Sequence, residues 1–197
     1  MNDSTVSYAI GAGTLKLLLG DITRDDADAI VNAANSALAG GGGVDGAIHQ
    51  AAGPKLHPAC QEIIAKIGHL PAGDAAITPG FNLRAKYIIH TVGPIWHGGT
   101  DDEDAKLRSA YVKSIDLAAA NGCQSVSFPA ISTGVYHFPV DRAAPIALGA
   151  MAQALTDGTV QEIRLYLYGK HDYETWHAVA DTLFGEEKRR GLRRPGA

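Results

Sequence analysis

Short apolar runs alternate along the chain with longer segments in which apolar residues recur every three or four positions. The short runs are typical of buried strands, and the longer segments are typical of amphipathic helices. The predicted strands are Thr14 to Leu19, Ala29 to Ala33, Ala75 to Thr78, Tyr87 to Val92, Ser125 to Pro129 and Ile163 to Tyr168. One predicted helix begins near Val44, and the others are Lys55 to Ile67, Asp102 to Asn121, Val140 to Leu155 and Tyr173 to Phe184. This alternation predicts an α/β fold in which helices cover both faces of a sheet.

The composition indicates one globular domain, because 197 residues that are 46% hydrophobic can bury a sizeable core. We expect the domain to span residues 1–187, with residues 1–13 forming either an added edge strand or a loose arm. Basic residues cluster only in residues 188–197, which we expect to be a disordered tail. A net charge of −4 gives no sign of a general nucleic-acid surface. Only the tail could bind RNA or an acidic protein.

Cysteine usage and the distribution of apolar residues suggest a compartment. Cys60 and Cys123 are the only cysteines, and the N-terminus lacks the charged and apolar regions of a signal peptide. No apolar run approaches the roughly 20 residues that cross a bilayer. We therefore expect a cytoplasmic protein with no membrane span, and a monomer. No zinc site is expected, because His57 and Cys60 have no second pair of ligands at a suitable spacing.

The segment from Asn32 to Gly53 combines side-chain amides, a run of four glycines and an Asp/His pair. Glycine has no Cβ, so a ligand can approach the backbone of Gly40 to Gly43 closely. Four glycines in succession lose much conformational entropy on folding, which a simple connector would not require. The helix that begins near Val44 would point its free N–H groups and positive dipole end into the loop. We therefore predict a phosphate-binding loop.

Two kinds of polar side chain flank this loop. Asp45 lies in the first turn of the predicted helix and His49 follows four residues later, so both share one helix face. A carboxylate beside an oriented or proton-donating imidazole is one arrangement that activates water. The predicted strand at residues 29–33 runs into Asn32 and Asn35, where amides suit a hydroxyl-rich ligand such as ribose but are just as common in turns.

In its motifs and their order, the chain resembles the macrodomain family, and within it the MacroD-type enzymes that hydrolyse ADP-ribose esters. The matching blocks are GDIT at Gly20 to Thr23, NAAN at Asn32 to Asn35, GGGGVDGAIHQAAG at Gly40 to Gly53, and PAISTGVYHFP at Pro129 to Pro139. The likeness covers residues 14–185, and the glycine block is its most specific part. The resemblance implies a three-layer α/β/α sandwich around a central mixed, mostly parallel sheet.

The resemblance also implies roles for individual residues. Asp21 and the backbone of Ile22 would read the adenine, and Tyr168 would stack on it. Asn35 would hold a hydroxyl of the distal ribose, while Asp45 would orient or deprotonate a water beside the diphosphate. His49 would steady Asp45 or pass a proton. The remaining ligand-binding residues would be Asn32, Gly41, Gly42, Gly43 and Val44 near the first loop, and Ser132, Thr133, Gly134, Val135 and Tyr136 in a second loop.

The function that follows is that of a hydrolase without metal or cofactor, which removes mono-ADP-ribose from acidic side chains and deacetylates O-acetyl-ADP-ribose. Its partners would be ADP-ribose, O-acetyl-ADP-ribose and ADP-ribosylated proteins, with nucleic acid only as ADP-ribosylated ends or through the tail. The alternative is a reader that binds ADP-ribose without turnover, which needs no water-activating carboxylate. In one departure from relatives, His137 and Phe138 replace a glycine and a tyrosine. His137 would either affect the site, by narrowing the substrate range or slowing product release, or point to solvent.

Two other classes match single motifs only. Gly41 to Gly46 satisfies the dinucleotide-binding pattern GxGxxG, but a polar stretch separates it from the preceding strand and a helix follows it. Ala130 to Gly134 is one residue away from the GxSxG nucleophile elbow, with His171 and His177 as conceivable bases. That elbow requires an immediate helix, which the residues after Gly134 delay.

Overall fold

A single mixed sheet runs through the protein, of which the computed structural model describes residues 4–191. The order of its seven strands is β1-β2-β7-β6-β3-β5-β4. Strands β2, β7, β6, β3 and β5 run parallel, whereas β1 and β4 lie antiparallel at the two edges. The bounds are β1 Thr5–Ile10, β2 Gly13–Leu19, β3 Ala29–Ala33, β4 Ala75–Pro79, β5 Tyr87–Thr91, β6 Ser125–Pro129 and β7 Glu162–Leu167. The predicted mixed, mostly parallel sheet is confirmed.

Strand β1 decides between the two expectations for the N-terminal segment. It pairs with β2 from Thr5 opposite Leu18 to Ile10 opposite Gly13, so it is an added edge strand. The tight turn between the two strands requires a positive φ, which Gly11 adopts at 58°.

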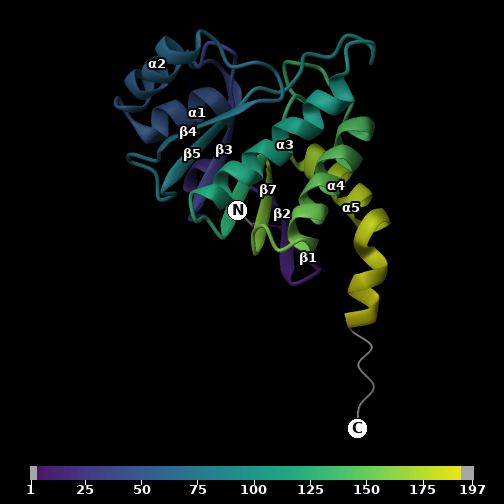
Figure 1. Ribbon diagram of the computed structural model, residues 1–197. Helices are drawn as coiled ribbons and strands as arrows, with labels where there is room; N and C mark the ends of the chain where they lie inside the picture. Colours follow the sequence, from purple (N-terminus) through teal and green to yellow (C-terminus); the bar gives the residue numbers. More distant parts are fainter. Residues whose placement is uncertain (1–3, 192–197) are drawn as a thin grey trace.

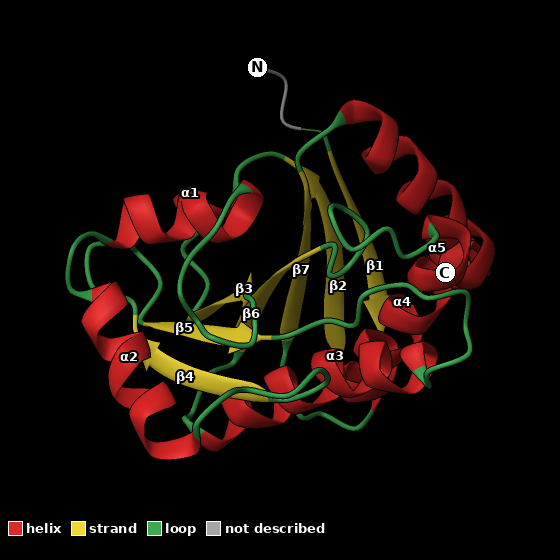
Figure 2. Ribbon diagram, turned by 90° about the horizontal axis from the view of Figure 1, so that it is seen from above, coloured by secondary structure: helices red, strands yellow, loops and turns green. Residues whose placement is uncertain are grey.

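Helices cover both faces of the sheet and complete the predicted three layers. Helices α1 (Gly43–Ala52) and α2 (Leu56–Ile67) pack on one face, with the short 3₁₀ helix η1 (Ile22–Arg24) beside α1. Helices α3 (Glu103–Ala120), α4 (Val140–Thr156) and α5 (Lys170–Gly191) pack on the other. Seen from above, the strands lie between these two groups of helices (Figures 1 and 2).

Helix α5 is longer than the apolar pattern predicts, because it begins at Lys170 and ends at Gly191. Residues 188–191 of the predicted tail therefore belong to this helix, while residues 192–197 lie outside the described part of the chain. Within residues 4–191, no helix is long and apolar enough to span a membrane.

The core consists of two apolar clusters, one on each face of the sheet, because successive strand residues point to opposite faces. Ile88 of β5 packs with Ile48 and Leu56 beneath α1 and α2. The next residue, Ile89, belongs to the larger cluster that includes Trp176 of α5. A residue's position along β3 or β5 therefore decides which helices it meets.

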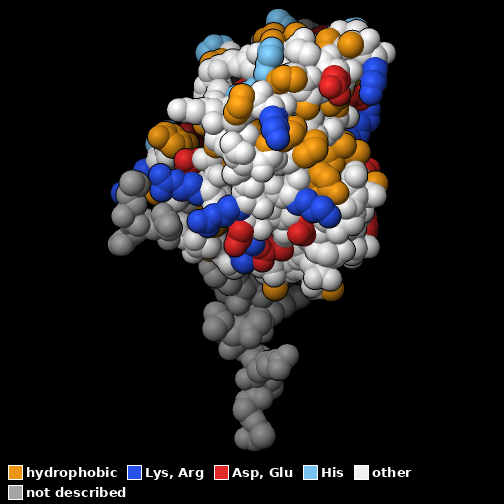
Figure 3. Space-filling view, turned by 90° about the vertical axis from the view of Figure 1, so that its left-hand side faces the viewer, with side chains coloured by type: hydrophobic (Ala, Val, Ile, Leu, Met, Phe, Trp, Pro, Cys, Tyr) orange, Lys and Arg blue, Asp and Glu red, His pale blue; other side chains and the backbone are white. Residues whose placement is uncertain are grey.

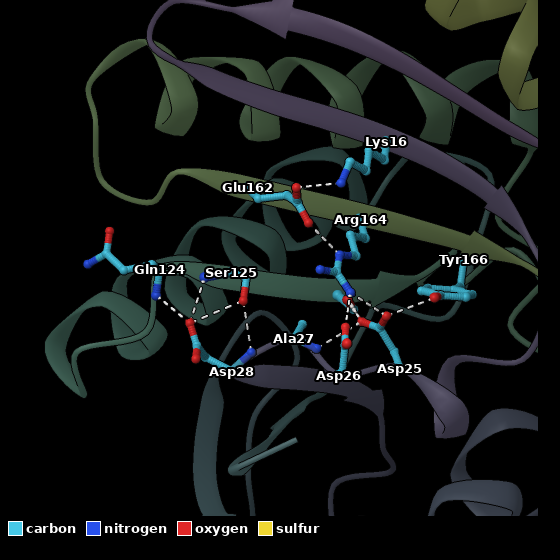
Figure 4. A network of polar contacts seen from close by, with 11 residues as sticks. Lys16, Asp25, Asp26, Ala27, Asp28, Gln124, Ser125, Glu162, Arg164 and Tyr166 are labelled. Carbon is cyan, nitrogen blue, oxygen red and sulfur yellow. Dashed lines mark hydrogen bonds and ion pairs between the residues drawn. The ribbon is translucent and has the colours of Figure 1, made fainter. Parts of the chain in front are cut away.

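A charged network fixes the segment between η1 and β3 against the neighbouring strands (Figure 4). Nη1 of Arg164 on β7 lies 2.6 Å from Oδ1 of Asp25 and 2.7 Å from Oδ1 of Asp26. Nε of Arg164 contacts Glu162 on the same strand. The hydroxyl of Tyr166 donates to Asp25 Oδ1 at 2.8 Å. This network holds Tyr166 in place, and Tyr166 lines one of the cavities described below.

The visible surface carries charges of both signs. On the face in Figure 3, Lys and Arg side chains lie close to Asp and Glu side chains, so this face presents no uninterrupted basic stripe. Clustered cations are what non-specific binding to a nucleic-acid backbone requires.

Candidate active site

A groove lies beyond the carboxyl ends of the parallel strands, where the loops that follow β2, β3, β6 and β7 converge. It consists of two cavities of about 410 Å³ and about 540 Å³. Both cavities are lined by Gly43, Val44, Ala130 and Gly134, so they are continuous at these residues.

The groove brings together most of the residues predicted from the sequence. Asn35, Gly41, Gly42, Asp45, Ser132, Val135 and Tyr136 line the first cavity, and Asp21, Ile22, Thr133 and Tyr168 line the second. Gly43, Val44 and Gly134 line both. Among the predicted site residues, Asn32 and His49 line neither cavity.

The glycine loop presents bare backbone to the groove. Gly40 and Gly43 have φ values of 77° and 59°, which favour glycine. Within residues 4–191, the backbone N–H groups of Gly41 to Asp45 have no hydrogen-bond acceptor. These free donors and the N-terminus of α1 give this part of the groove a positive potential that favours an anion.

Asn35 holds the glycine loop in shape. Its Nδ2 donates to the Gly40 carbonyl at 2.9 Å, and its Oδ1 accepts from the backbone N–H groups of Ala37 and Ala39, each at 3.2 Å. Both lone pairs of Oδ1 are thus used, but one N–H of the amide is left over. Asn35 therefore has a donor available at the cavity wall.

The second loop follows β6 and supplies a further set of donors. Its turn depends on Ser132 at φ 66° and is closed by the N–H of Phe138, which donates to the Ser132 carbonyl at 3.0 Å. In the part of the chain that the structure describes, the N–H groups of Thr133 to Tyr136 have no acceptor. Both loops, with their unpaired backbone donors, thus line one groove.

Phe138 and His137 have opposite environments. Phe138 is buried and packs on Trp96 with ring centroids 4.7 Å apart, which anchors the loop to the core. His137 is exposed at φ 55°. Of the two expectations for His137, the structure favours the one in which its side chain points to solvent.

Asp45 is the buried carboxylate of the groove, with a side chain that is 7% exposed. Its Oδ1 accepts from Asn32 Nδ2 at 2.7 Å and lies 3.5 Å from His49 Nε2. Its Oδ2 is directed toward Gly41, where an added Cβ would lie 3.3 Å away. One oxygen is therefore held by side chains and the other faces the cavity wall.

Asn32 lies behind Asp45, and the prediction that it binds ligand is wrong for this structure because the residue is completely buried. Asn32 belongs to β3, two positions after Ile30, so its side chain points beneath α1 and meets Asp45 there. His49 also lies behind the cavity wall, against Gly40. Both side chains support Asp45 from the protein side.

A buried histidine that was not predicted from the sequence, His90, lies next to Asn32. Nδ1 of His90 lies 3.2 Å from Asn32 Nδ2, while its Nε2 lies 3.0 Å from Thr78 Oγ1 and 3.8 Å from Cys60 Sγ. Burial, and then the charge of His49, lower the pKa of His90 to about 3. Burial, and then the charge of Asp45, raise the pKa of Cys60 to about 11. His90 is thus neutral and Cys60 is a thiol near neutral pH.

At the other end of the groove, Asp21 is the N-cap of η1. Its Oδ1 accepts from the N–H and the hydroxyl of Thr23, and its Oδ2 is 3.8 Å from Arg24 Nε. Tyr168 is 89% exposed at the rim. Tyr166 also lines this end, and burial followed by its hydrogen bond to Asp25 raises its pKa.

No cluster of three or more His, Cys, Asp or Glu side chains that could hold a metal ion occurs among the residues that the structure describes. The chemistry of the groove lies in its backbone donors, its amide groups and the carboxylate of Asp45. These groups suit an anion that carries hydroxyl groups.

The three-layer fold with this groove at the strand ends is that of a macrodomain. The Macro domain family model matches residues 31–147, which include both loops and Asp45. The chain belongs to this family.

Relatives and solved structures extend the likeness to most of the chain. An O-acetyl-ADP-ribose deacetylase from Escherichia fergusonii is 53% identical over 75% of this chain and 84% of its own length. The Oceanobacillus iheyensis macrodomain with ADP superimposes with a TM-score of 0.91 at 41% identity, over 94% of this chain and 100% of that one. The Trypanosoma brucei macrodomain in complex with ADP-ribose gives a TM-score of 0.76 at 37% identity, over 84% and 68%.

Proposed function

We propose that this chain is a hydrolase of ADP-ribosyl esters that removes mono-ADP-ribose from acidic side chains of proteins and deacetylates O-acetyl-ADP-ribose. Similarity to a named O-acetyl-ADP-ribose deacetylase and to macrodomains solved with ADP or ADP-ribose supports this substrate class. The observation that carries the proposal is the arrangement of Asp45, whose Oδ1 is fixed by Asn32 and His49 while Oδ2 is directed toward Gly41 in the wall of the groove.

The ligand would lie along the groove with adenine at Asp21, Ile22 and Tyr168. The N–H of Ile22 and the remaining lone pairs of Asp21 Oδ2 would read the edge of the base, and Tyr168 would stack on its face. The diphosphate would lie where the cavities join, at Gly43 and Gly134, because the free backbone donors of both loops converge there.

The distal ribose would then reach the first cavity. Asn35 would donate its remaining N–H to a ribose hydroxyl, and Tyr136 would cover the sugar. Asp45 would face the ester from behind Gly41, with its Oδ2 accepting a proton from the attacking water. Because Oδ1 is already engaged, the carboxylate cannot turn away from the groove without losing the hydrogen bond from Asn32.

Hydrolysis joins the water oxygen to the acyl carbon or to the distal-ribose carbon and breaks the ester C–O bond. In acyl attack the proton from water goes to the departing ribose oxygen, whereas in ribose attack the carboxylate departs and a base takes the proton. That base is either Asp45 or a phosphate oxygen of the substrate, in which case Asp45 only positions the water. In isotopically labelled water, acyl attack labels the released acid and ribose attack labels ADP-ribose.

The competing function is that of a reader, which binds ADP-ribose without turnover. The test is incubation of the purified chain with a mono-ADP-ribosylated protein carrying ester linkages to acidic residues, and separately with O-acetyl-ADP-ribose. The proposal predicts release of ADP-ribose from both, in contrast to a matched sample of the Asp45→Ala variant. Tight binding of ADP-ribose with turnover of neither substrate would establish the reader instead.

A further inference from the structure

We propose that His90 is a positioning residue for the hydrolysis. As the neutral tautomer with its proton on Nε2, it orients the amide of Asn32, which in turn fixes the carboxylate of Asp45. This inference rests on the proposed function and adds to it a residue that touches neither substrate nor water, since His90 is completely buried.

The register of the sheet brings these residues together. Asn32 of β3 and His90 of β5 are directly paired neighbours in the parallel ladder. On the antiparallel edge strand β4, Ala76 pairs with His90, and Thr78 lies two positions further along the same strand. Because strand residues alternate between faces, all three side chains point beneath α1 and α2. The helices bring Asp45 and Cys60 to the same place.

The position of Asp45 decides the orientation of the Asn32 amide. The Asp45 oxygen is 2.7 Å from the nearer amide atom, so that atom must be the NH₂ group, because a carbonyl there would repel the carboxylate. The same NH₂ group lies 3.2 Å from Nδ1 of His90. Its two hydrogens therefore serve Asp45 and His90.

The orientation of Asn32 in turn decides the tautomer of His90. Since Asn32 donates to it, Nδ1 of His90 must carry a lone pair, and the ring proton is on Nε2. Nε2 lies 3.0 Å from the hydroxyl oxygen of Thr78, which accepts the hydrogen bond. Thr78 thus supports this tautomer and completes a chain of contacts that runs from Thr78 through His90 and Asn32 to Asp45.

The orientation of Asn32 is locally unfavourable, which argues that it serves the site. Oδ1 of Asn32 is buried and has no hydrogen-bond partner among residues 4–191. A buried carbonyl without a partner in the protein costs free energy, and a catalytic role is one of the recognised reasons for such an exception. This orientation of the Asn32 amide instead provides a hydrogen bond to Oδ1 of Asp45, while Oδ2 of Asp45 is directed toward Gly41.

Two variants of His90 separate positioning from packing. In His90→Asn the new amide oxygen can take the place of Nδ1 and accept from Asn32. In His90→Gln the longer side chain reaches the place of Nε2, toward Thr78, and leaves no acceptor for Asn32. Both replace the buried ring with a smaller amide, so a purely structural role predicts similar losses.

The positioning role predicts that His90→Asn keeps kcat on O-acetyl-ADP-ribose within about threefold, while His90→Gln loses roughly 10- to 100-fold. Calorimetry should give both variants an ADP-ribose Kd within about threefold of the unmodified protein. Thr78 supplies a second pair: Thr78→Ser keeps the acceptor and should keep kcat, whereas Thr78→Val removes it and should lower kcat by about tenfold.

The tautomer is also open to direct measurement in the unmodified protein, without any variant that could fail to fold. A long-range ¹H–¹⁵N NMR spectrum should show His90 with Nε2 protonated and Nδ1 unprotonated at neutral pH. A proton on Nδ1 would overturn the inference, as would equal kcat in His90→Asn and His90→Gln. If the unmodified protein binds ADP-ribose but hydrolyses neither ester, the proposed function fails first and the positioning role fails with it.

Discussion

Replacement of Asp45 by asparagine should separate turnover from binding. An asparagine of the same shape can keep its carbonyl oxygen between Asn32 and His49, so the contacts that fix Oδ1 survive. The group directed toward Gly41 changes from a carboxylate oxygen to an NH₂ group, which cannot accept a proton from water. A hydrogen bond to a charged group contributes about 1.5–3 kcal/mol, so kcat should fall roughly 10- to 100-fold.

The assay is the initial rate of acetate release from saturating O-acetyl-ADP-ribose, with calorimetric titration of ADP-ribose and thermal unfolding of the same samples. ADP-ribose should bind Asp45→Asn within about tenfold of the unmodified protein. Asp172→Asn is a matched control, because Asp172 lines the opposite cavity of the groove. That variant should change KM more than kcat. Asp45→Asn with an unchanged kcat, or with binding and turnover lost in equal measure, would refute the assigned role.

Three further predictions follow from the same contacts. Gly41→Ala should fold, because the φ of Gly41 is not positive. The added methyl group would lie 3.3 Å from Asp45 Oδ2 and crowd the attacking water. Single-turnover assays should show at least a tenfold lower rate constant, roughly the effect of a misplaced reactant. Burial, with the charge of His49, lowers the pKa of His90 from 6.5 to about 3. Between these two pH values the unfolded chain binds a proton at His90 that the folded chain does not bind. The free energy of unfolding therefore decreases as the pH drops from 6.5 toward 3. His90→Asn should flatten that slope by up to about 1.4 kcal/mol per pH unit in denaturant titrations. For Glu103, burial is outweighed by N–H donors that include those of Asp101 and His97, and its pKa falls from 4.5 to about 2. The ionised Glu103 carboxylate therefore stabilises the fold above pH 4.5, and this effect is lost toward pH 2. Glu103→Gln should unfold at a lower temperature than the unmodified protein at neutral pH, and its unfolding temperature should fall less on acidification. Thermal unfolding scans between pH 7 and pH 2 measure both effects.

The strands and their order of alternation with helices could be predicted because each element carries a strong local pattern. The apolar runs at residues 29–33 and 87–91 can be recognised without knowledge of their partners. The same holds for the glycine loop, since free N–H groups at a helix start depend only on adjacent residues. These local signals identified Asp45 and the glycine loop, whereas the second loop was expected from the resemblance to macrodomains, and the structure places all three in one groove.

The support behind Asp45 could not be predicted in the same way. Asn32 and Asn35 look alike in the sequence, but one points beneath α1 and the other follows the end of β3 at the cavity wall. His90 and Thr78 act on Asn32 through the pairing of β3 with β5 and of β5 with β4. That register depends on contacts between residues far apart along the chain, which no single segment encodes.

The claim on which the account depends most is that the groove between the glycine loop and the second loop binds ADP-ribose. Isothermal titration calorimetry of the purified chain with ADP-ribose tests it directly. We expect saturable binding at one site per chain, and weaker binding when the ligand lacks the diphosphate. No heat of binding from a chain that is demonstrably folded would contradict it.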